Sequence, residues 1–287
     1  MSKNILKILL VLTAILLVAC GGKTISSEDK VQKLRYGIAA EITQINPLLN
    51  EEGHSEIDGL LFRGLMQPTE TNEVKGDLAI DWKISKDLLE YQFTLRKDAF
   101  WQDDQRLTAH DVKFTLDKIR DPSINSPSQS EFRLIKEVTV VSDYVLQIEL
   151  TEPFPALLNK LKIGIVPKHL LEHENMNKTT FSRNPVGNGP YQLKEWGIDN
   201  TIILTRNEKY YGPSPQIDEV LFIPVPDENT RLLQLKTGEL HLAQLTPSQL
   251  NAISETDSFS VHEIPTADYR AVQYNMKLPI FQDARVR

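Results

Sequence analysis

The chain has one cysteine, Cys20, among its 287 residues, and this limits how any fold it adopts can be stabilised. A single cysteine cannot form an intramolecular disulfide, so the folded state must depend on the burial of an apolar core. The composition allows such a core, because 40% of the residues are hydrophobic and 25% are charged, as in soluble globular proteins. Cysteine usage by itself does not distinguish an oxidising from a reducing compartment.

The N-terminus has the three parts of a secretory signal. Lys3 and Lys7 precede the apolar run Ile8–Ala19, and small residues follow it. The run is shorter than the roughly twenty apolar residues that a transmembrane helix needs. The sequence Leu17-Val18-Ala19-Cys20 resembles a bacterial lipobox, in which the signal is cut before the cysteine and the cysteine thiol carries a diacylglycerol. The alternative is a free buried thiol behind an ordinary signal peptide.

Lipid attachment at Cys20 would give the chain an extracytoplasmic address. Residues 1–19 would be the signal peptide, and residues 20–33, rich in Gly, Ser and charge, would form the lipid anchor and a flexible tether. Several acyl chains, such as palmitate, would hold the protein on the outer face of the cell membrane without a spanning segment. The net charge of -7 and the lack of a sustained Lys/Arg run predict no nucleic-acid partner.

The remaining pattern mixes strands and helices without strict alternation, which predicts an α/β fold with antiparallel hairpins. Gly and Pro are dense in Pro185–Pro190, which we interpret as the seam after a helix-rich insert. The predicted strands are Leu34–Ala39, Tyr91–Leu95, Val138–Val141, Val145–Leu150, Tyr191–Trp196, Thr201–Thr205 and Val220–Val225. The predicted helices are Ile57–Met66, a segment capped by Thr108 with Asp111 three residues later, Glu228–Lys236, and a segment opened by Thr246.

One short motif could carry metal chemistry. His169-Leu170-Leu171-Glu172-His173 fits the H-x-x-E-H pattern of inverted zinc peptidases, but a catalytic zinc also needs a third protein ligand, and the sequence singles none out. Metal binding without catalysis and a solvated helix face are the alternatives, and the polar continuation "EHENMNK" favours the helix face. We therefore predict no metal, no cofactor and no enzymatic activity.

Seven segments together resemble one family, the extracellular solute-binding proteins of family 5, which serve peptide, nickel and related ABC importers. The segments are "AAEITQINPLL", "LLFRGLMQPT", "YQFTLRKDAFWQDDQRLTAHDVKFTLDKIRDP", "VGNGPYQLKEW", "NEKYYG", "LKTGELHLAQL" and "NMKLPIFQDARVR". They occur in the family's order and spacing, and they cover nearly everything from Leu34 to Arg287.

The resemblance implies a periplasmic-binding-protein-like class II fold of two lobes that close on a ligand by a hinge. Residues 34–60 and 186–265 would form lobe I, with a smaller domain, residues 61–185, inserted into it. Residues 266–287 would begin lobe II, whose remainder is missing, so we expect a fragment or a truncated gene. The implied function is capture of oligopeptides or dipeptides outside the cell by a monomeric lipoprotein, which delivers them to the permease subunits of an ABC importer.

The resemblance also suggests which residues face the ligand. The loop Gly53-His54-Ser55 would offer backbone groups to an extended peptide, because added-strand pairing uses main-chain hydrogen bonds. Gln244, Leu245 and Tyr269 are weaker candidates. A nickel-chelate, haem or sugar ligand of the same fold remains an alternative, as does, from another class, a zinc peptidase that uses His169 and His173.

Overall fold

The structure is a computed structural model that describes residues 31–50, 56–71, 73–253, 259–263 and 273–286. It divides into two compact units, residues 1–244 and residues 245–287. Within the ranges just given, no helix is both long enough and apolar enough to cross a membrane.

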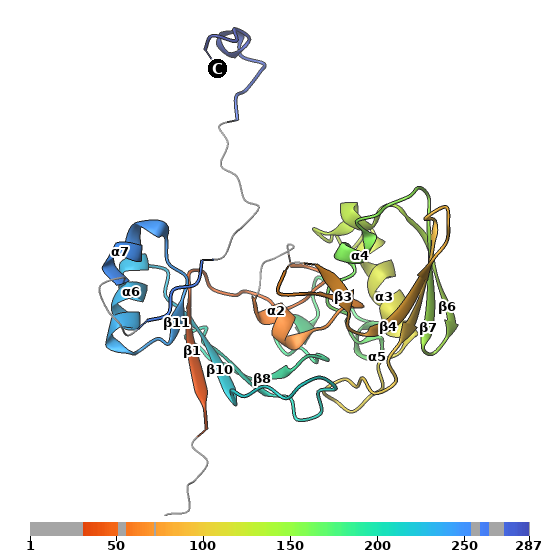
Figure 1. Ribbon diagram of the computed structural model, residues 1–287, viewed down its shortest axis with the longest axis horizontal. Helices are drawn as coiled ribbons and strands as arrows, with labels where there is room; N and C mark the ends of the chain where they lie inside the picture. The colour runs from red at the N-terminus through yellow and green to blue at the C-terminus, as the bar shows by residue number, and fades with distance from the viewer. Residues whose placement is uncertain (1–30, 51–55, 72, 254–258, 264–272, 287) are drawn as a thin grey trace, which may run out of the picture. The chain divides into compact units, whose positions relative to one another are not determined.

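A five-stranded sheet forms one part of the first unit (Figure 1), with the strand order β11-β1-β10-β9-β8. Strand β1 lies between β10 and the short edge strand β11 and runs parallel to both, whereas β9 runs antiparallel to both β10 and β8. The rings of Tyr36 and Phe222 pack against each other at a tilt on one face, with centroids 5.5 Å apart, and both side chains are buried. The strands are β1 Lys33–Ile38, β8 Tyr191–Trp196, β9 Ile202–Arg206, β10 Glu219–Pro224 and β11 Leu242–Ala243.

A four-stranded antiparallel sheet, ordered β4-β5-β7-β6, forms the other part of the first unit. In β5, Tyr91, Phe93 and Leu95 point to the core, which is the period-two pattern of a half-buried strand. Helix α3 packs against β6 and β7 through its buried stripe of Val112, Leu116 and Ile119. The bounds are β4 Ala79–Ile84, β5 Glu90–Leu95, α3 Ala109–Arg120, β6 Ile135–Ser142 and β7 Val145–Leu150.

The shorter elements complete both units. In the first unit, β2 and β3 form a two-stranded antiparallel ribbon. Its short elements are α2 Glu56–Leu61, β2 Met66–Pro68, β3 Val74–Gly76, the 3-10 helix η1 Gln129–Phe132, α4 Leu157–Lys160, α5 Lys168–Leu171, the 3-10 helix η2 Thr180–Ser182 and α6 Glu228–Thr237. The second unit contains the 3-10 helix η3 Pro247–Gln249, α7 Leu250–Ile253 and the 3-10 helix η4 Pro279–Phe281.

The predicted cap of α3 is confirmed. The backbone N–H of Thr108 donates to Asp111 Oδ2 at 2.8 Å, so one of the free donors at the helix start finds an acceptor. The other Asp111 oxygen accepts the backbone N–H of Lys168 at 3.0 Å, which ties the segment before α5 to α3.

Two predictions about local structure are wrong. The helix predicted over Ile57–Met66 ends at Leu61, and Met66 already lies in β2. Tertiary contact overrides helix periodicity here, because the chain at Gly64 crosses another segment so closely that a Cβ would lie 2.6 Å from the Ile163 carbonyl oxygen. The insert is also not helix-rich, because residues 61–185 contain the four-stranded sheet and the β2–β3 ribbon. The lobe and domain boundaries remain predictions.

The predicted seam is a place of close backbone approach, which gives a stability test. A Cβ on Gly187 would lie 2.0 Å from the Leu61 carbonyl oxygen, whereas a Cβ on Gly59 meets nothing within 4 Å. We expect Gly187→Ala to lower the free energy of unfolding by about 2 kcal/mol or more, because the backbone must shift. Gly59→Ala, the matched control inside α2, should leave it unchanged or raise it by up to about 1 kcal/mol. Urea denaturation measures both; equal midpoints for the two variants would contradict this account.

Candidate ligand-binding site

A cavity of about 450 Å³ lies where β1 ends, and its volume is within the usual range for small-ligand sites. Most of its wall is the continuous segment Ile38–Gln44 that follows β1. Leu49 and Asn50 from the same loop, Glu56 from α2, and Pro127 complete the lining. One continuous stretch of the chain therefore supplies most of the cavity wall.

The peptide groups of this wall have no backbone partner in the part of the chain that the structure describes. Among the residues that the structure describes, the backbone N–H and C=O groups of residues 39–44 make no hydrogen bond with other backbone groups. The segment is nevertheless anchored at both ends. The Ile38 carbonyl accepts from the Val225 N–H at 2.9 Å, and the Ile45 N–H donates to the Ser182 carbonyl at 2.8 Å. An added peptide strand requires backbone N–H and C=O groups that are fixed in place and not already paired.

Buried Asn46 fixes the loop beyond this wall. Its side-chain amide donates to Ser182 Oγ at 3.2 Å, and its carbonyl oxygen Oδ1 accepts the N–H of Leu48 at 3.0 Å. These hydrogen bonds therefore hold the loop in place beside the cavity.

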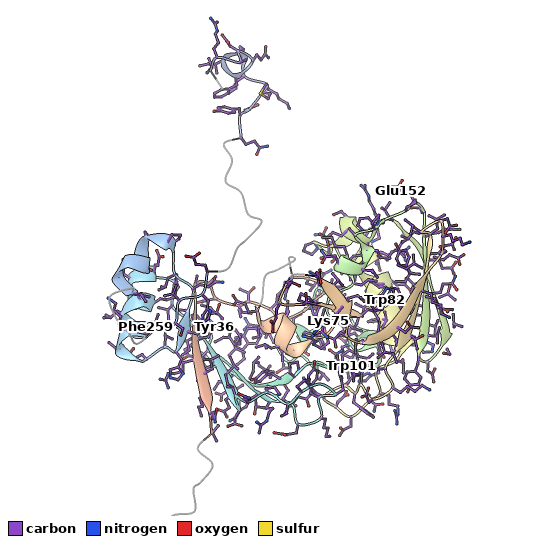
Figure 2. The ribbon with its side chains drawn as sticks, in the orientation of Figure 1. Tyr36, Lys75, Trp82, Trp101, Glu152 and Phe259 are labelled. Atoms are coloured by element: carbon purple, nitrogen blue, oxygen red, sulfur yellow. The ribbon has the colours of Figure 1, made fainter. Side chains whose placement is uncertain are left out.

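Glu56, the first residue of α2, connects the cavity to the five-stranded sheet. Its Oε1 accepts hydrogen bonds from the Tyr36 hydroxyl at 2.7 Å and from Gln244 Nε2 at 3.2 Å. Burial raises the pKa of Tyr36, and the hydrogen bond to Glu56 raises it further. Tyr36 therefore remains a protonated donor at neutral pH, which fixes the carboxylate of Glu56 against the sheet (Figure 2 shows the position of Tyr36).

Glu41 connects the same cavity to the β8–β9 hairpin. Asn200 Nδ2, in the hairpin turn, donates to Glu41 Oε2 at 3.0 Å. Asn200 has a φ of 61°, a left-handed conformation that asparagine tolerates better than most residues.

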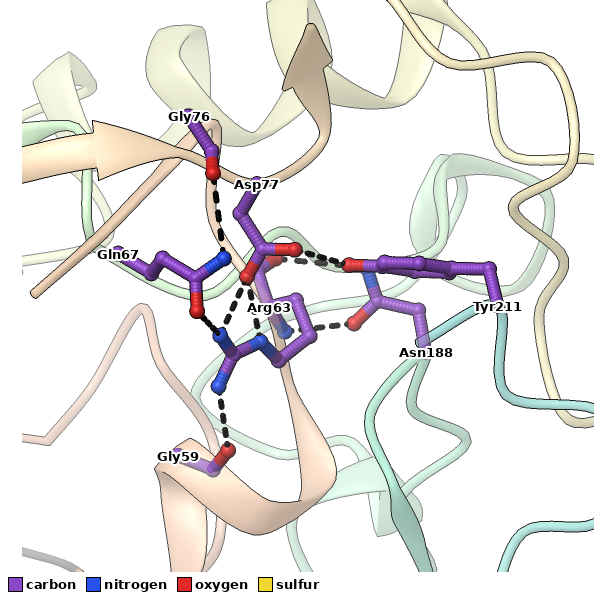
Figure 3. A network of polar contacts seen from close by, with 7 residues as sticks. All are labelled: Gly59, Arg63, Gln67, Gly76, Asp77, Asn188 and Tyr211. Atoms are coloured by element: carbon purple, nitrogen blue, oxygen red, sulfur yellow. Dashed lines mark hydrogen bonds and ion pairs between the residues drawn. The ribbon is translucent and has the colours of Figure 1, made fainter. Parts of the chain in front are cut away.

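A polar network holds the far end of α2 (Figure 3). Two consecutive amides, Asn188 and Gly189, donate to the Leu61 carbonyl at 3.0 and 2.8 Å. Asn188 also forms a reciprocal pair with the backbone of Arg63, accepting its N–H at 2.8 Å and donating to its C=O at 3.3 Å. The short helix α2 is therefore fixed at both ends.

Arg63 and Asp77 form the ionic centre of this network. Arg63 Nε and Nη2 both lie 2.5 Å from Asp77 Oδ2, and the Asp77 side chain is 2% exposed. The Tyr211 hydroxyl donates to the other Asp77 oxygen at 2.6 Å, and burial raises the pKa of Tyr211. The Arg63 Nη2 group also donates to Gln67 Oε1 at 2.7 Å (Figure 3).

The structure describes only some of the predicted site residues. Gly53, His54, Ser55, Tyr269 and the anchor Cys20 lie outside the described residues. Gln244 follows β11 and touches Glu56, a cavity residue. Leu245 is half-buried and belongs to the second unit. Ligand contact by any of these residues remains a prediction.

The H-x-x-E-H segment does not form a regular helix of the length that a zinc peptidase uses. Helix α5 ends at Leu171, before His173. His169 Nε2 lies 2.6 Å from Asp103 Oδ2, and both side chains are about one-third exposed. Across the described ranges, no group of three or more His, Cys, Asp or Glu side chains is arranged to hold a metal ion.

Sequence reasoning missed the two cavity carboxylates, Glu41 and Glu56, and the whole Arg63 network. Glu41 lies in "AAEITQINPLL", one of the segments that carries the family resemblance, but no spacing rule connects it to Glu56. The cavity wall itself also begins earlier in the chain than the predicted loop Gly53–Ser55.

Comparison with known proteins gives the family. The model of bacterial extracellular solute-binding proteins, family 5 Middle, matches residues 73–287. A putative ABC transporter peptide-binding protein of Brucella ovis is 30% identical over 219 residues, which cover 75% of this chain and 41% of that protein. The oligopeptide-binding protein AppA of Bacillus subtilis is 27% identical over 298 residues, covering 98% of this chain and 55% of AppA.

Solved structures show the same fold. NikZ of Campylobacter jejuni, in complex with Ni(L-His), superposes with a TM-score of 0.83 at 34% identity over 88% of this chain and 51% of NikZ. AppA in complex with a nonapeptide superposes with a TM-score of 0.75 at 27% identity over 79% of this chain and 47% of that one. The chain thus spans about half the length of the relatives it matches.

A mixed α/β unit with a cavity beside free peptide groups, together with these matches, defines a solute-binding fold of the periplasmic type. The chain belongs to the bacterial extracellular solute-binding proteins of family 5. The family resemblance read from seven sequence segments is confirmed.

The Arg63–Asp77 pair gives a second stability test. Asp77→Asn leaves a largely buried guanidinium without its counter-charge, and removing one partner of a buried pair commonly costs about 3–5 kcal/mol. The Arg63 side chain is 19% exposed, so we expect a loss of about 2–3 kcal/mol in the free energy of unfolding. Asp81→Asn, at an exposed position on β4, is the control and should change it by less than about 0.5 kcal/mol. If both variants unfold at the same urea concentration, the pair is not the ionic centre described here.

Proposed function

We propose that this protein captures peptides outside the cell and delivers them to the permease subunits of an ABC importer. The observation that carries the proposal is the row of peptide groups at residues 39–44, which lack backbone partners among the described residues and line a cavity of about 450 Å³. Main-chain pairing binds peptides of varied sequence, because every peptide presents the same N–H and C=O groups.

The relatives support a peptide ligand. The Brucella ovis protein is named a putative ABC transporter peptide-binding protein, and the AppA structure holds a nonapeptide. Capture by closure of two lobes about a hinge, delivery to a permease and a monomeric state are parts of the same proposal. In this role the protein binds its ligand and performs no covalent chemistry.

One observation favours a second candidate, a nickel-histidine chelate. NikZ, whose structure contains Ni(L-His), superposes on 88% of this chain at 34% identity. A chelate of this kind would bring its own metal ligands, so the cavity would need to supply only shape and hydrogen bonds.

A ligand screen separates the two candidates. We expect at least some members of a set of di- to octapeptides to raise the melting temperature of the purified protein, because a ligand that binds only the folded state stabilises it. Isothermal titration calorimetry would then give the affinities, with Ni(L-His), nickel alone and haem as the other arms. Stabilisation by Ni(L-His) with no response to any peptide would contradict the peptide proposal.

We also propose that Cys20 carries a lipid that anchors the protein to the outer face of the cell membrane. The lipobox-like sequence before Cys20 supports this, and an extracellular solute-binding family is consistent with it. A tethered binder would stay close to its permease and gain effective concentration there.

Cys20→Ser tests the anchor. We expect the variant to leave the membrane fraction and to lose incorporation of labelled palmitate, because serine cannot form the thioether. Ser26→Ala, a change of similar size nearby, is the control and should remain in the membrane fraction. A Cys20→Ser protein that still sediments with membranes would show that another feature holds it there.

A further inference from the structure

The charged residues that line the cavity all have the same sign. Glu41 and Glu56 are the charged members of the described lining, which contains no lysine, arginine or histidine. The other side chains are neutral, and Ile42, Leu49 and Pro127 provide apolar surface. The lining is therefore a mixture of polar and apolar groups, and its formal charges are those of two carboxylates.

Neither carboxylate is neutralised by a neighbour among the residues that the structure describes. Glu56 Oε1 accepts from a phenol and an amide, those of Tyr36 and Gln244, and Glu41 Oε2 accepts from the amide of Asn200. These donors orient the carboxylates but carry no charge. In the part of the chain that is described, neither residue takes part in an ion pair.

Arg231, a cation whose charge acts on Tyr36, is engaged elsewhere. Arg231 lies in α6, is 6% exposed and does not line the cavity. Its Nη1 donates to the carbonyls of Val225 and Pro226 at 2.7 and 3.1 Å. Its charge lowers the pKa of Tyr36, which opposes the effects of burial and of Glu56 without reversing them.

We infer that the cavity selects a ligand with a positively charged group, an ammonium or a guanidinium, which Glu41 and Glu56 bind. The inference rests on the proposed function and names the class of peptide, one with a lysine or arginine side chain. The hydrocarbon stem of such a side chain would pack on Ile42, Leu49 and Pro127, and its charged end would reach the carboxylates. Charge-assisted hydrogen bonds are stronger than neutral ones, so the charge itself should decide affinity.

Matched peptides and matched variants test the charge alone. Peptides that contain lysine or arginine are compared by calorimetry with the same peptides containing Nε-acetyllysine or citrulline, which keep the shape and lose the charge. For the unsubstituted protein we expect the cationic peptide of each pair to bind at least about tenfold more tightly, which equals about 1.4 kcal/mol. This preference should shrink at high salt, because ionic strength screens it.

The variants Glu41→Gln and Glu56→Gln keep size and hydrogen-bond acceptors while removing one charge each. Each should reduce the preference for the cationic peptide by several-fold. Glu152→Gln is the control, since Glu152 is an exposed carboxylate after β7, well away from Tyr36 in Figure 2. It should keep the full preference.

The outcomes separate this inference from the function on which it rests. Equal binding of cationic and neutral peptides overturns the inference and leaves peptide capture standing. If no peptide binds, peptide capture fails, and free arginine, 1,5-diaminopentane and spermidine become the probes. Thermal stabilisation by these amines that Glu41→Gln and Glu56→Gln abolish would support a cation site, and no stabilisation by any amine would overturn it.

Discussion

The carbonyl of Leu61, at the end of α2, accepts hydrogen bonds from the successive amides of Asn188 and Gly189, and much of the first unit depends on this contact. A helix of six residues has little stability of its own, so α2 must be held by its surroundings. The glycines at 187 and 189 allow the close approach, since a Cβ at either would collide with the backbone of α2. Two segments far apart in sequence are joined here without any disulfide.

The same contact has consequences for binding. The network of Arg63, Asp77 and Tyr211 stabilises the C-terminal end of α2, and Glu56 at its N-terminal end meets Tyr36 and Gln244. The helix therefore links a buried ionic centre to the wall of the cavity. This arrangement explains how a loop-lined cavity can present a carboxylate at a fixed position, because Tyr36 and Asp77 are buried and both are hydrogen-bonded.

Local sequence patterns predicted the helices and strands well, but tertiary contacts determined where some of these elements end. The alternation in Tyr91–Leu95 and the cap at Thr108 are local signals, and both match β5 and α3. The end of α2 was misjudged because apolar periodicity continues past Leu61, while crossing segments at Gly64 and Asn188 end the helix. Strand β11 has two residues, too few to show any period.

The candidate site was less predictable, for a physical reason. In the sequence, Glu41 and Glu56 look like ordinary acidic residues. They line one cavity only because the fold brings the end of β1 close to the start of α2. The family resemblance predicted a ligand-facing loop at residues 53–55, and because these residues lie outside the described ranges, this stays a prediction. The resemblance supplied the class of protein, whereas the positions of the carboxylates required the structure.

The central claim is that residues 39–44 form the wall to which a peptide ligand pairs. Hydrogen–deuterium exchange of the protein with and without a bound peptide tests it most directly, because these amides lack backbone partners among the described residues and should exchange rapidly when free. The account predicts that a saturating peptide slows exchange in residues 39–44. Unchanged exchange there, with protection appearing instead around Asp103 and His169, would contradict it.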